Sequence, residues 1–273
     1  MGEFAPAQIA AWQAAIGRRE VRQERLEAGS LRRYARAVGA EVERVPIGHW
    51  AFFQPDPGDA DIGGDGHPRR GGFLPDIPLP RRMFAASDIR FAAPLLVGEM
   101  AELESTIVAL RHKAGRAGDL VFVDVDRTIR QDGLVRVGER QTYVYRGDGM
   151  PVALPDPIAA IEGECWQPDT VNLFRFSAAM FNGHRIHYDL PYAREAENYP
   201  DLVVHGPFTA AKLAAFASRA GRLERFTFRA QAPLFVRQPI RLQWHGEYEV
   251  RAVRCDGVVA MTAALQWPIA DAA

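Results

Sequence analysis

Cysteine is scarce in this chain of 273 residues: only Cys165 and Cys255 occur, and they form no CxxC pair. We therefore expect neither a disulfide framework nor a cysteine-rich zinc site, and reduced thiols in the cytoplasm are the simplest interpretation. The opening segment "MGEFAPAQIAAW" lacks the basic and apolar regions of a signal peptide. No apolar run approaches the roughly 18 residues that would cross a bilayer, so no membrane partner is expected.

The net charge is close to zero, and nucleotide-binding motifs are absent. The formal charge of −1 gives no reason to expect nucleic acid or an anionic membrane surface as a partner. No GxGxxG follows a strand-like segment and no GxxxxGK[ST] occurs, so no nicotinamide or flavin is expected. What is present, 48% hydrophobic and 25% charged residues, is typical of a soluble globular protein with a full core.

Two helices are predicted near the start of the chain. The first covers residues 6–17, where proline occupies a plausible first helical position. The second lies in "SLRRYARAVGA", with Ser30 as the N-cap and Gly39 as the C-terminal stop.

The rest of the first half predicts a loop and then a sheet. Residues 54–82 are rich in proline, glycine and aspartate, which predicts an extended surface loop. Between Asp88 and Arg146, apolar and polar residues alternate in three segments, as in an antiparallel meander with one buried face.

The second half repeats this order. A short helix and a loop precede a longer helix over residues 206–221, which Gly221 would end. The strands that follow are predicted in "LERFTFRAQ", "PIRLQWHGEYEVRAVR" and "GVVAMTAALQW".

The two halves also resemble each other in sequence. Residues 92–103 align with residues 231–242 at a constant offset of 139. The identical positions are Ala93, Pro94, Leu95, Val97 and Leu103, matched by Ala232, Pro233, Leu234, Val236 and Leu242. We therefore predict a duplication, with two tandem α+β domains over residues 1–150 and 156–273.

The halves differ in one predicted element. A sheet that wraps one central helix would suit each half, and residues 206–221 supply that helix in the second. In the first half the equivalent segment is "PIGHWAFFQPDPG", where Pro55 and Pro57 would end a helix after about one turn. The concave face of the first sheet is therefore predicted to have room for something long.

Reactive side chains are densest in Phe181–Asp189, "FNGHRIHYD". One interpretation is a structural polar turn, and a second is a metal site, because His184, His187 and Asp189 could supply ligands to zinc or iron. Arg185 between the imidazoles and the absence of a cysteine cluster weaken the metal alternative, and we expect no metal.

A third interpretation is general acid–base chemistry on a water molecule. A histidine with a pKa near 6.5 can accept and return a proton at neutral pH, and an amide such as Asn182 can orient the same water. "VVHGPFTAA" adds a place for developing negative charge, because Gly206 and Pro207 stand where the longer helix begins. Backbone N–H groups and the helix dipole there would polarise a carbonyl oxygen.

These motifs resemble a known family. "LFRFSAAMFNGHRIHYDLPYA" is similar to the active-site segment of the MaoC-like, type-2 enoyl-CoA hydratases and 3-hydroxyacyl-thioester dehydratases. That family has the pattern Asp-x-Asn-Pro-x-His-x-Asp, followed by "HG" at the start of the hot-dog helix. The variant found here most resembles the branch with mesaconyl-C4-CoA (3-methylfumaryl-CoA) hydratases and mitochondrial-type dehydratases. The resemblance covers both halves and implies a tandem (double) hot-dog fold, with the helix degenerate in the N-terminal half.

The resemblance also implies roles for individual residues. His187 falls on the family's catalytic histidine and Asp189 on the acidic residue two positions later. His184 falls on the family's asparagine and Asn182 on its catalytic aspartate, which is a departure because an amide cannot accept a proton as a carboxylate does. This implies that His187 is the principal base, with Asn182 and His184 positioning the water.

The remaining implied roles concern binding. The "HG" pair is His205 and Gly206, and the Gly206 N–H would donate to the thioester oxygen. The first half has no His-x-Asp, so it should be non-catalytic and should accommodate the acyl group or CoA. Arg185 and Arg194 are the candidates for binding a substrate carboxylate, and the pair Arg81–Arg82 for binding CoA phosphates.

The function implied is the reversible hydration of an α,β-unsaturated acyl thioester, with mesaconyl-C4-CoA as a candidate substrate, acyl-CoA as partner and no cofactor. Two alternatives stay open. A hot-dog thioesterase would hydrolyse the same kind of substrate and could use Asp189 as its carboxylate. A non-catalytic acyl-thioester-binding protein would explain the amide at Asn182. Hot-dog sheets in the family pair edge to edge, so each half should cover the exposed strand of the other. A homodimer or higher homo-oligomer of double hot dogs is also expected.

Overall fold

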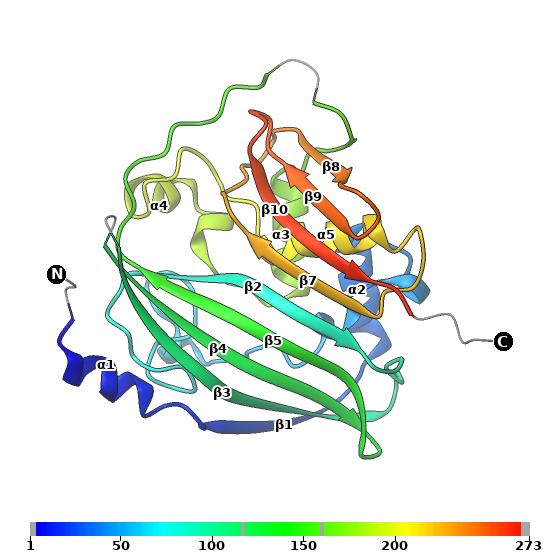
Figure 1. The fold of residues 1–273 in the computed structure, drawn as a ribbon, viewed down its shortest axis with the longest axis horizontal. Helices are drawn as coiled ribbons and strands as arrows, with labels where there is room; N and C mark the ends of the chain where they lie inside the picture. Colours follow the sequence, from blue (N-terminus) through cyan, green and yellow to red (C-terminus); the bar gives the residue numbers. More distant parts are fainter. Residues whose placement is uncertain (1–3, 116–117, 159–160, 269–273) are drawn as a thin grey trace.

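The computed structural model describes residues 4–115, 118–158 and 161–268. Within them, ten strands form one antiparallel sheet in the order β1-β3-β4-β5-β2-β7-β10-β9-β8-β6 (Figure 1). The first half contributes β1 (Arg19–Arg25), β2 (Arg81–Phe91), β3 (Met100–Gly115), β4 (Gly118–Gln131) and β5 (Leu134–Arg146). The second half contributes β6 (Glu164–Trp166), β7 (Arg225–Ala230), β8 (Ile240–Trp244), β9 (Glu249–Val253) and β10 (Val259–Gln266).

The strand order is the same on both sides of the central pair, β2 and β7. Reading outward, β2-β5-β4-β3-β1 corresponds to β7-β10-β9-β8-β6. The aligned segments 92–103 and 231–242 lie at equivalent places, because β2 ends at Phe91 and β7 at Ala230. The predicted tandem arrangement is therefore confirmed. The domain limits 1–150 and 156–273 stay a prediction, because β2 and β7 pair antiparallel and join both halves in one sheet.

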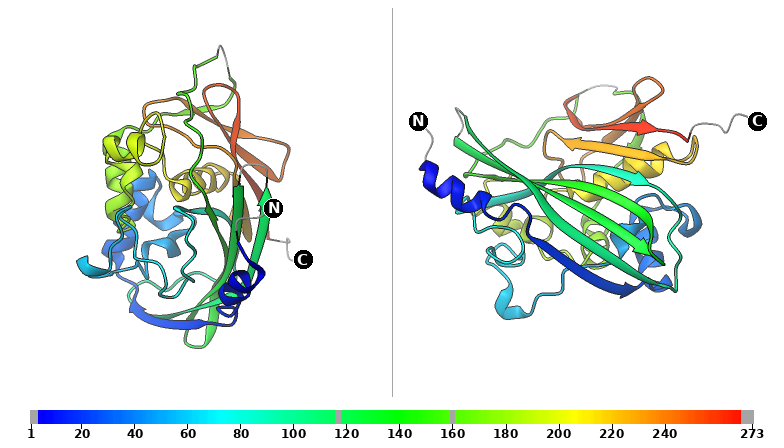
Figure 2. Two further views of the ribbon diagram at one scale, coloured as in Figure 1. Left: turned by 90° about the vertical axis from the view of Figure 1, so that its left-hand side faces the viewer. Right: turned by 60° about the horizontal axis from the view of Figure 1, so that its bottom comes forward.

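Helices α2 (Ala28–Val38), α3 (Thr170–Ala179), α4 (Leu190–Glu195) and α5 (Gly206–Ala217) lie on one side of the sheet (Figure 2). The central helix of the second half is α5, which packs against β7, β9 and β10 and also touches β2. Its alanines Ala210, Ala211 and Ala214 are fully buried. Such small side chains let the helix axis approach the sheet closely. A shorter helix, α1 (Pro6–Gln13), packs beside β3.

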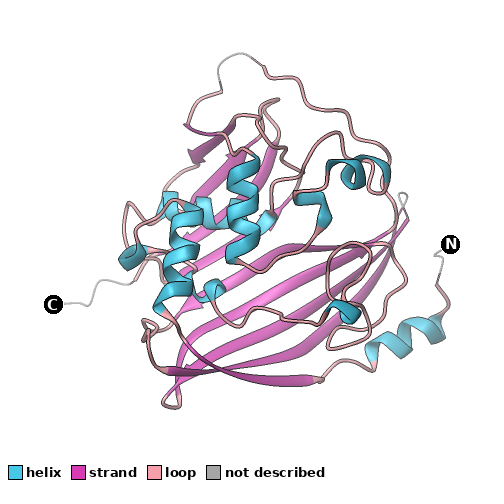
Figure 3. Ribbon diagram, turned by 180° about the vertical axis from the view of Figure 1, so that it is seen from behind, coloured by secondary structure: helices cyan, strands magenta, loops and turns pink. Residues whose placement is uncertain are grey.

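The first half has no counterpart of α5 among its described residues. At the corresponding place a 3-10 turn (Gly48–Ala51) precedes the prolines, and the chain continues up to β2 as a loop with one more 3-10 turn (Asp59–Asp61). Figure 3 shows this difference from the helix side: helices cover the second-half strands, whereas loops cross those of the first half. The prediction that the helix ends after about one turn is confirmed.

Several predicted boundaries were wrong. The second helix starts at Ala28 with Glu27 as its N-cap, so Ser30 lies inside the helix, where its hydroxyl accepts from Arg33. Its stop was correct, since Gly39 has a φ of 75° in the left-handed region. Helix α5 ends at Ala217, before Gly221, because a tight turn already begins at Ser218.

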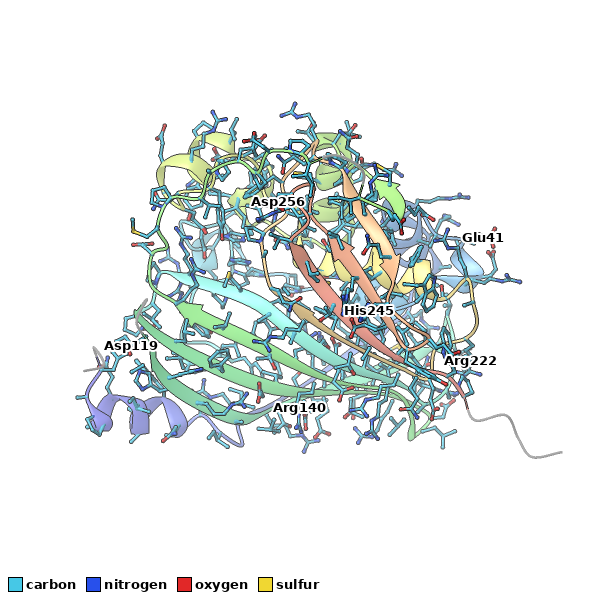
Figure 4. All side chains as sticks on the ribbon, turned by 45° about the horizontal axis from the view of Figure 1, so that its top comes forward. Glu41, Asp119, Arg140, Arg222, His245 and Asp256 are labelled. Atoms are coloured by element: carbon cyan, nitrogen blue, oxygen red, sulfur yellow. The ribbon has the colours of Figure 1, made fainter. Side chains whose placement is uncertain are left out.

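The outer face of the sheet carries cross-strand ion pairs. Arg140, labelled in Figure 4, donates from Nε and Nη2 to the carboxylate of Asp126 at 2.6 and 2.8 Å. Both cysteines are free thiols, with Cys165 exposed and Cys255 buried. No helix within the described ranges is long and apolar enough to cross a membrane.

Candidate active site

A cavity of about 800 Å³ lies over the concave face of the first half. Three parts of the chain line it: inner-face side chains of the first sheet such as Tyr143, the long loop with His67, and the segment after α3 with Asn182. Pro207, at the start of α5, also belongs to the lining. The cavity therefore occupies the space that the missing helix leaves, and the proposed catalytic segment borders it.

Four imidazoles form a row beside this cavity. His205 stacks on His187 with ring centroids 3.6 Å apart, and His187 meets His184 edge-on at 5.3 Å. His184 in turn lies against His67 at 4.1 Å. The three histidines singled out in the sequence thus come together, and a fourth joins them from the other half of the chain.

The orientation of His187 is determined by one backbone contact. Its Nδ1 lies 2.7 Å from the carbonyl oxygen of Val203. A carbonyl only accepts hydrogen bonds, so Nδ1 carries the proton and Nε2 keeps a free lone pair. Burial, with smaller effects from His205 and His184, lowers the pKa of His187 well below 6.5. The imidazole is therefore neutral at pH 7, and its Nε2 can accept a proton.

The neighbouring imidazoles are anchored by side chains. His184 donates from Nε2 to Glu197 at 3.1 Å, because an ionised carboxylate can only accept. His205 is fully buried and hydrogen-bonds through Nε2 with the hydroxyl of Ser177 at 2.8 Å. Burial, together with His184, lowers the pKa of His205 to about 3. Both rings support His187 rather than reaching into the cavity.

Asn182 and Gly206 belong to two of the segments that carry this row, close to His184 and His205 in the chain. The Oδ1 of Asn182 accepts the backbone N–H of His184 at 2.9 Å, so the Nδ2 group is the part that can meet a water in the cavity. Gly206 is the first residue of α5, where backbone N–H groups have no partner within the helix. A Cβ at Gly206 would lie 3.7 Å from the Phe84 carbonyl oxygen, which is an ordinary contact. Packing alone does not require glycine there.

The long loop contributes residues that the sequence reading missed. His67 hydrogen-bonds through Nδ1 to Asp65 at 3.3 Å, and burial, opposed by that bond, lowers the pKa of His67 to about 4. Gly66 has a φ of +85°, and a Cβ there would lie 1.9 Å from the carbonyl oxygen of Gly183. The two backbones are therefore in contact, and the loop with His67 packs directly against the proposed catalytic segment. An Asp-x-His inside a glycine-rich loop was the only available signal.

Three residues that the sequence assigned to the site have other partners. Asp189 caps α4 by accepting the Tyr192 N–H at 3.1 Å, and it also accepts from Arg185 at 2.7 Å. Arg185 lies over the Tyr192 ring as well, and the exposed Arg194 donates to the Pro200 carbonyl. None of the three lines the cavity, but His187 and Gly206 are not among its lining residues either, so what decides is that these three side chains already have partners. The geometry thus gives Asp189 a structural role and does not support either arginine as the carboxylate ligand.

The arginine pair suggested for CoA phosphates also needs correction. Arg81 is 4% exposed, donates to the Glu197 carbonyl and lies over the Tyr199 ring, so it is part of the interior. Arg82 is half-buried and lies 3.4 Å from the Pro68 carbonyl oxygen. Neither guanidinium lines the cavity.

One group could in principle hold a metal ion. Asp65, His67 and His184 offer ligand atoms that lie within 4.8 Å of one another. In this structure, His67 is hydrogen-bonded to Asp65 and His184 to Glu197, so each imidazole already has a carboxylate partner. The two rings lie 4.1 Å apart between centroids and are tilted by 35°.

Comparison with known proteins gives a matching family and a relative that aligns over almost the whole chain. A family model described as hydroxyacyl-thioester dehydratase type 2 matches residues 47–236. Mesaconyl-C4-CoA hydratase from Chloroflexus aurantiacus is 41% identical over 273 residues, which cover 93% of this chain and 97% of the relative.

Solved structures agree on the fold. HtdX of Mycobacterium tuberculosis superposes with a TM-score of 0.65 at 17% identity, covering 91% of this chain and 99% of that one. A conserved hypothetical protein of the same organism, described as having a double hotdog fold, superposes with a TM-score of 0.50 at 15% identity, covering 92% and 96%. The predicted tandem hot-dog fold is therefore confirmed.

Proposed function

Because this chain belongs to the hydroxyacyl-thioester dehydratase type 2 family, we infer that it catalyses the reversible hydration of an α,β-unsaturated acyl thioester. One observation of the site carries the assignment: the Nδ1–H of His187 is held by the Val203 carbonyl at 2.7 Å, which leaves Nε2 as a base. The family resemblance inferred from "FNGHRIHYD" is confirmed by the same matches.

We propose that His187 acts first as base and then as acid. In hydration, Nε2 takes a proton from a water molecule while the water oxygen bonds to the β-carbon. The electron pair of the double bond shifts towards the thioester oxygen and gives an enolate. The imidazolium then returns its proton to the α-carbon, which restores the thioester and the neutral imidazole. Because the pKa of His187 is low, its imidazolium is a stronger acid than free imidazolium and gives up its proton readily in this second step.

The enolate oxygen needs a positive environment, and the start of α5 supplies one. The thioester oxygen would accept the N–H of Gly206, with the positive end of the helix dipole behind it. Because Gly206 has no side chain, an oxygen can approach the backbone closely. Asn182 Nδ2 would hold the water, whereas His184 and His205 would position the His187 ring that they pack against.

Several finer statements belong to the same proposal. Mesaconyl-C4-CoA is the candidate substrate suggested by the relative's name. The reaction described uses only side chains and backbone of this chain, so we propose that it needs no metal or other cofactor. A homo-oligomer of double hot dogs and a cytoplasmic location are proposed on the grounds given by the sequence.

The test is a panel of enoyl-CoA thioesters, including mesaconyl-C4-CoA and crotonyl-CoA, followed by ultraviolet loss of conjugation. Thiol release is measured in the same cuvettes with a thiol reagent. Loss of conjugation without thiol release is expected, and it should survive prior treatment with a chelator. Thiol release as the main event would favour the thioesterase alternative, and binding without either change would favour an acyl-binding protein.

A further inference from the structure

We infer, building on the proposed function, that Arg127 binds a second carboxylate at the far end of the acyl group. The substrates would then be unsaturated dicarboxylic acyl thioesters, and Arg127 would be the residue that selects them.

Arg127 lies on the inner face of the first sheet and lines the cavity. It sits on β4 opposite Ser105 of β3 and Glu139 of β5. Its guanidinium makes no hydrogen bond and no ion pair with any residue of the described ranges. A guanidinium has five N–H donors in a planar fork that fits a carboxylate. Leaving these donors unused next to a cavity is costly unless a ligand or water meets them.

The nearest acidic residue, Glu139, does not form an ion pair with the Arg127 guanidinium. Glu139 is 5% exposed and already accepts from three donors: His49 Nε2 at 3.1 Å, Trp50 Nε1 at 3.1 Å and Ser87 Oγ at 2.7 Å. Burial opposes its ionisation, but the hydrogen bond and charge of His49, the charge of Arg127 and the bond from Gln141 together outweigh burial and lower the pKa of Glu139 to about 2. Arg127 adds only its longer-range field to that result. The N–H donors of Arg127 are thus left for a ligand in the cavity.

The other acidic, basic and imidazole side chains of the cavity are Glu20, Arg22, Asp59 and His67, of which His67 is neutral at pH 7. Arg22 is occupied, since it donates to the carbonyl oxygens of Phe53 and Gln54 at 2.9 and 2.7 Å. Glu20 pairs with Ser105 across β1 and β3, so it lies two strand spacings, roughly 10 Å, from Arg127. Arg127 is therefore the cation of this lining whose donors are free.

Neutral polar groups surround the same spot. The hydroxyl of Tyr143 donates to Gln141 Oε1 at 2.7 Å, and the Gln141 amide also donates to Glu139, which leaves one of its two N–H groups for a ligand. Ser105 adds a hydroxyl to the lining. These groups could complete the hydrogen bonds of a carboxylate that Arg127 holds.

The path from Gly206 to Arg127 runs along the inner face of the first sheet. Phe84 on β2 approaches Gly206, and its ring stacks on Tyr143 of β5 with centroids 5.6 Å apart. Arg127 is two strands from β2 and pairs with Glu139, four residues along β5 from Tyr143, so its Cα lies roughly 10 Å across and roughly 13 Å along the sheet from Phe84. Its positive charge still acts on the Tyr143 hydroxyl, where it opposes the rise in pKa that burial causes. An acyl group whose thioester oxygen is at Gly206 would therefore have to extend across Tyr143 to meet the guanidinium.

The test uses two substrates of equal length that differ only at the end of the acyl chain. Fumaryl-CoA has a carboxylate where crotonyl-CoA has a methyl group. The variants of the full chain are Arg127→Gln, Arg127→Lys and the control Arg140→Gln, which removes an arginine from the outer face of the neighbouring strand. Arg127→Gln should lower kcat/KM for fumaryl-CoA by about 10- to 100-fold, the scale of a charge-assisted hydrogen bond, with the change mainly in KM.

Crotonyl-CoA hydration by Arg127→Gln should stay within about two-fold of wild type, and Arg127→Lys should lose less than the glutamine variant on fumaryl-CoA. The control should change neither substrate. Equal losses on both substrates, or no loss on fumaryl-CoA, would overturn the inference.

Binding of saturated analogues provides a test that needs no variant and no turnover. Succinyl-CoA should bind the wild-type chain more tightly than butyryl-CoA by calorimetry, and equal binding would refute the role of Arg127. If the protein hydrates neither fumaryl-CoA nor crotonyl-CoA, the proposed function fails, whereas this binding difference still decides whether Arg127 recognises a carboxylate.

Discussion

Removing the base at His187 is the sharpest test of the site. His187→Ala deletes Nε2 and should lower turnover by roughly 10² to 10⁴, or about 2.7 to 5.4 kcal/mol in activation free energy. The same variant deletes the Nδ1–H that pairs with the Val203 carbonyl at 2.7 Å. A buried carbonyl left without a donor costs about 1 to 3 kcal/mol in stability. Loss of activity in this variant alone would therefore be ambiguous.

His187→Asn separates the two effects. The Asn Nδ2 takes the place of Nδ1 and can still donate to the Val203 carbonyl, but nothing replaces Nε2. Turnover should fall as far as in the alanine variant, whereas the free energy of unfolding from urea titration should stay near wild type. Turnover is read from ultraviolet loss of conjugation. An active asparagine variant beside an inactive alanine variant would show that His187 is needed for structure and not for proton transfer, and the proposed mechanism would be refuted.

Three further outcomes follow from the geometry. The free energy of unfolding should fall as pH drops below about 6.5, by up to ~1.4 kcal/mol per pH unit for each buried histidine. His67 and His205 have folded pKa values of about 4 and about 3, so between these values and about 6.5 only the unfolded chain binds the proton. Urea midpoints that do not move between pH 7.5 and 5 would contradict this. Gly66→Ala should lower both stability and turnover, since its Cβ would lie 1.9 Å from a backbone oxygen of the catalytic segment, and a variant with wild-type melting and kinetics would show that the loop is not locked there. Asp189→Ala should cost about 1 kcal/mol of stability through the lost helix cap and leave kcat nearly unchanged, whereas a hundred-fold drop in kcat would restore a catalytic role.

The parts of the site that are continuous in sequence could be predicted. Asn182, His184 and His187 lie within six residues, and the start of α5 follows in "HG", so the pattern alone brought them together. His67 could not be found in this way, because the loop that carries it has no periodic pattern. It is placed by a contact between two glycine backbones, Gly66 and Gly183, and such a contact leaves no trace in either segment taken alone.

The fold, too, could be predicted only in part. The long strands β3 to β5 were predicted because their inner faces are apolar enough to alternate with polar outer faces. Strand β1, "REVRQER", was missed although it pairs with β3 over its whole length. Its inward side chains include Glu20 and Arg22, which line the cavity and not the core. A strand that faces a cavity on one side and solvent on the other has no apolar stripe, so periodicity cannot identify it.

The missing helix explains why the first half keeps so many polar side chains on its inner face. In the second half, α5 covers the sheet with small apolar side chains, and every strand beneath it can be apolar inside. In the first half, the 3-10 turn that stands in its place contributes His49 and Trp50, and both donate to Glu139 on the sheet. These donors keep a buried carboxylate ionised, which an apolar helix in the same place could not do. A first half with its helix restored would need apolar residues at Glu139 and Arg127, and it would have no space for an acyl chain beside His187. The polar inner face and the cavity of the first half therefore both go with the absence of this helix, and they distinguish the first half from the second.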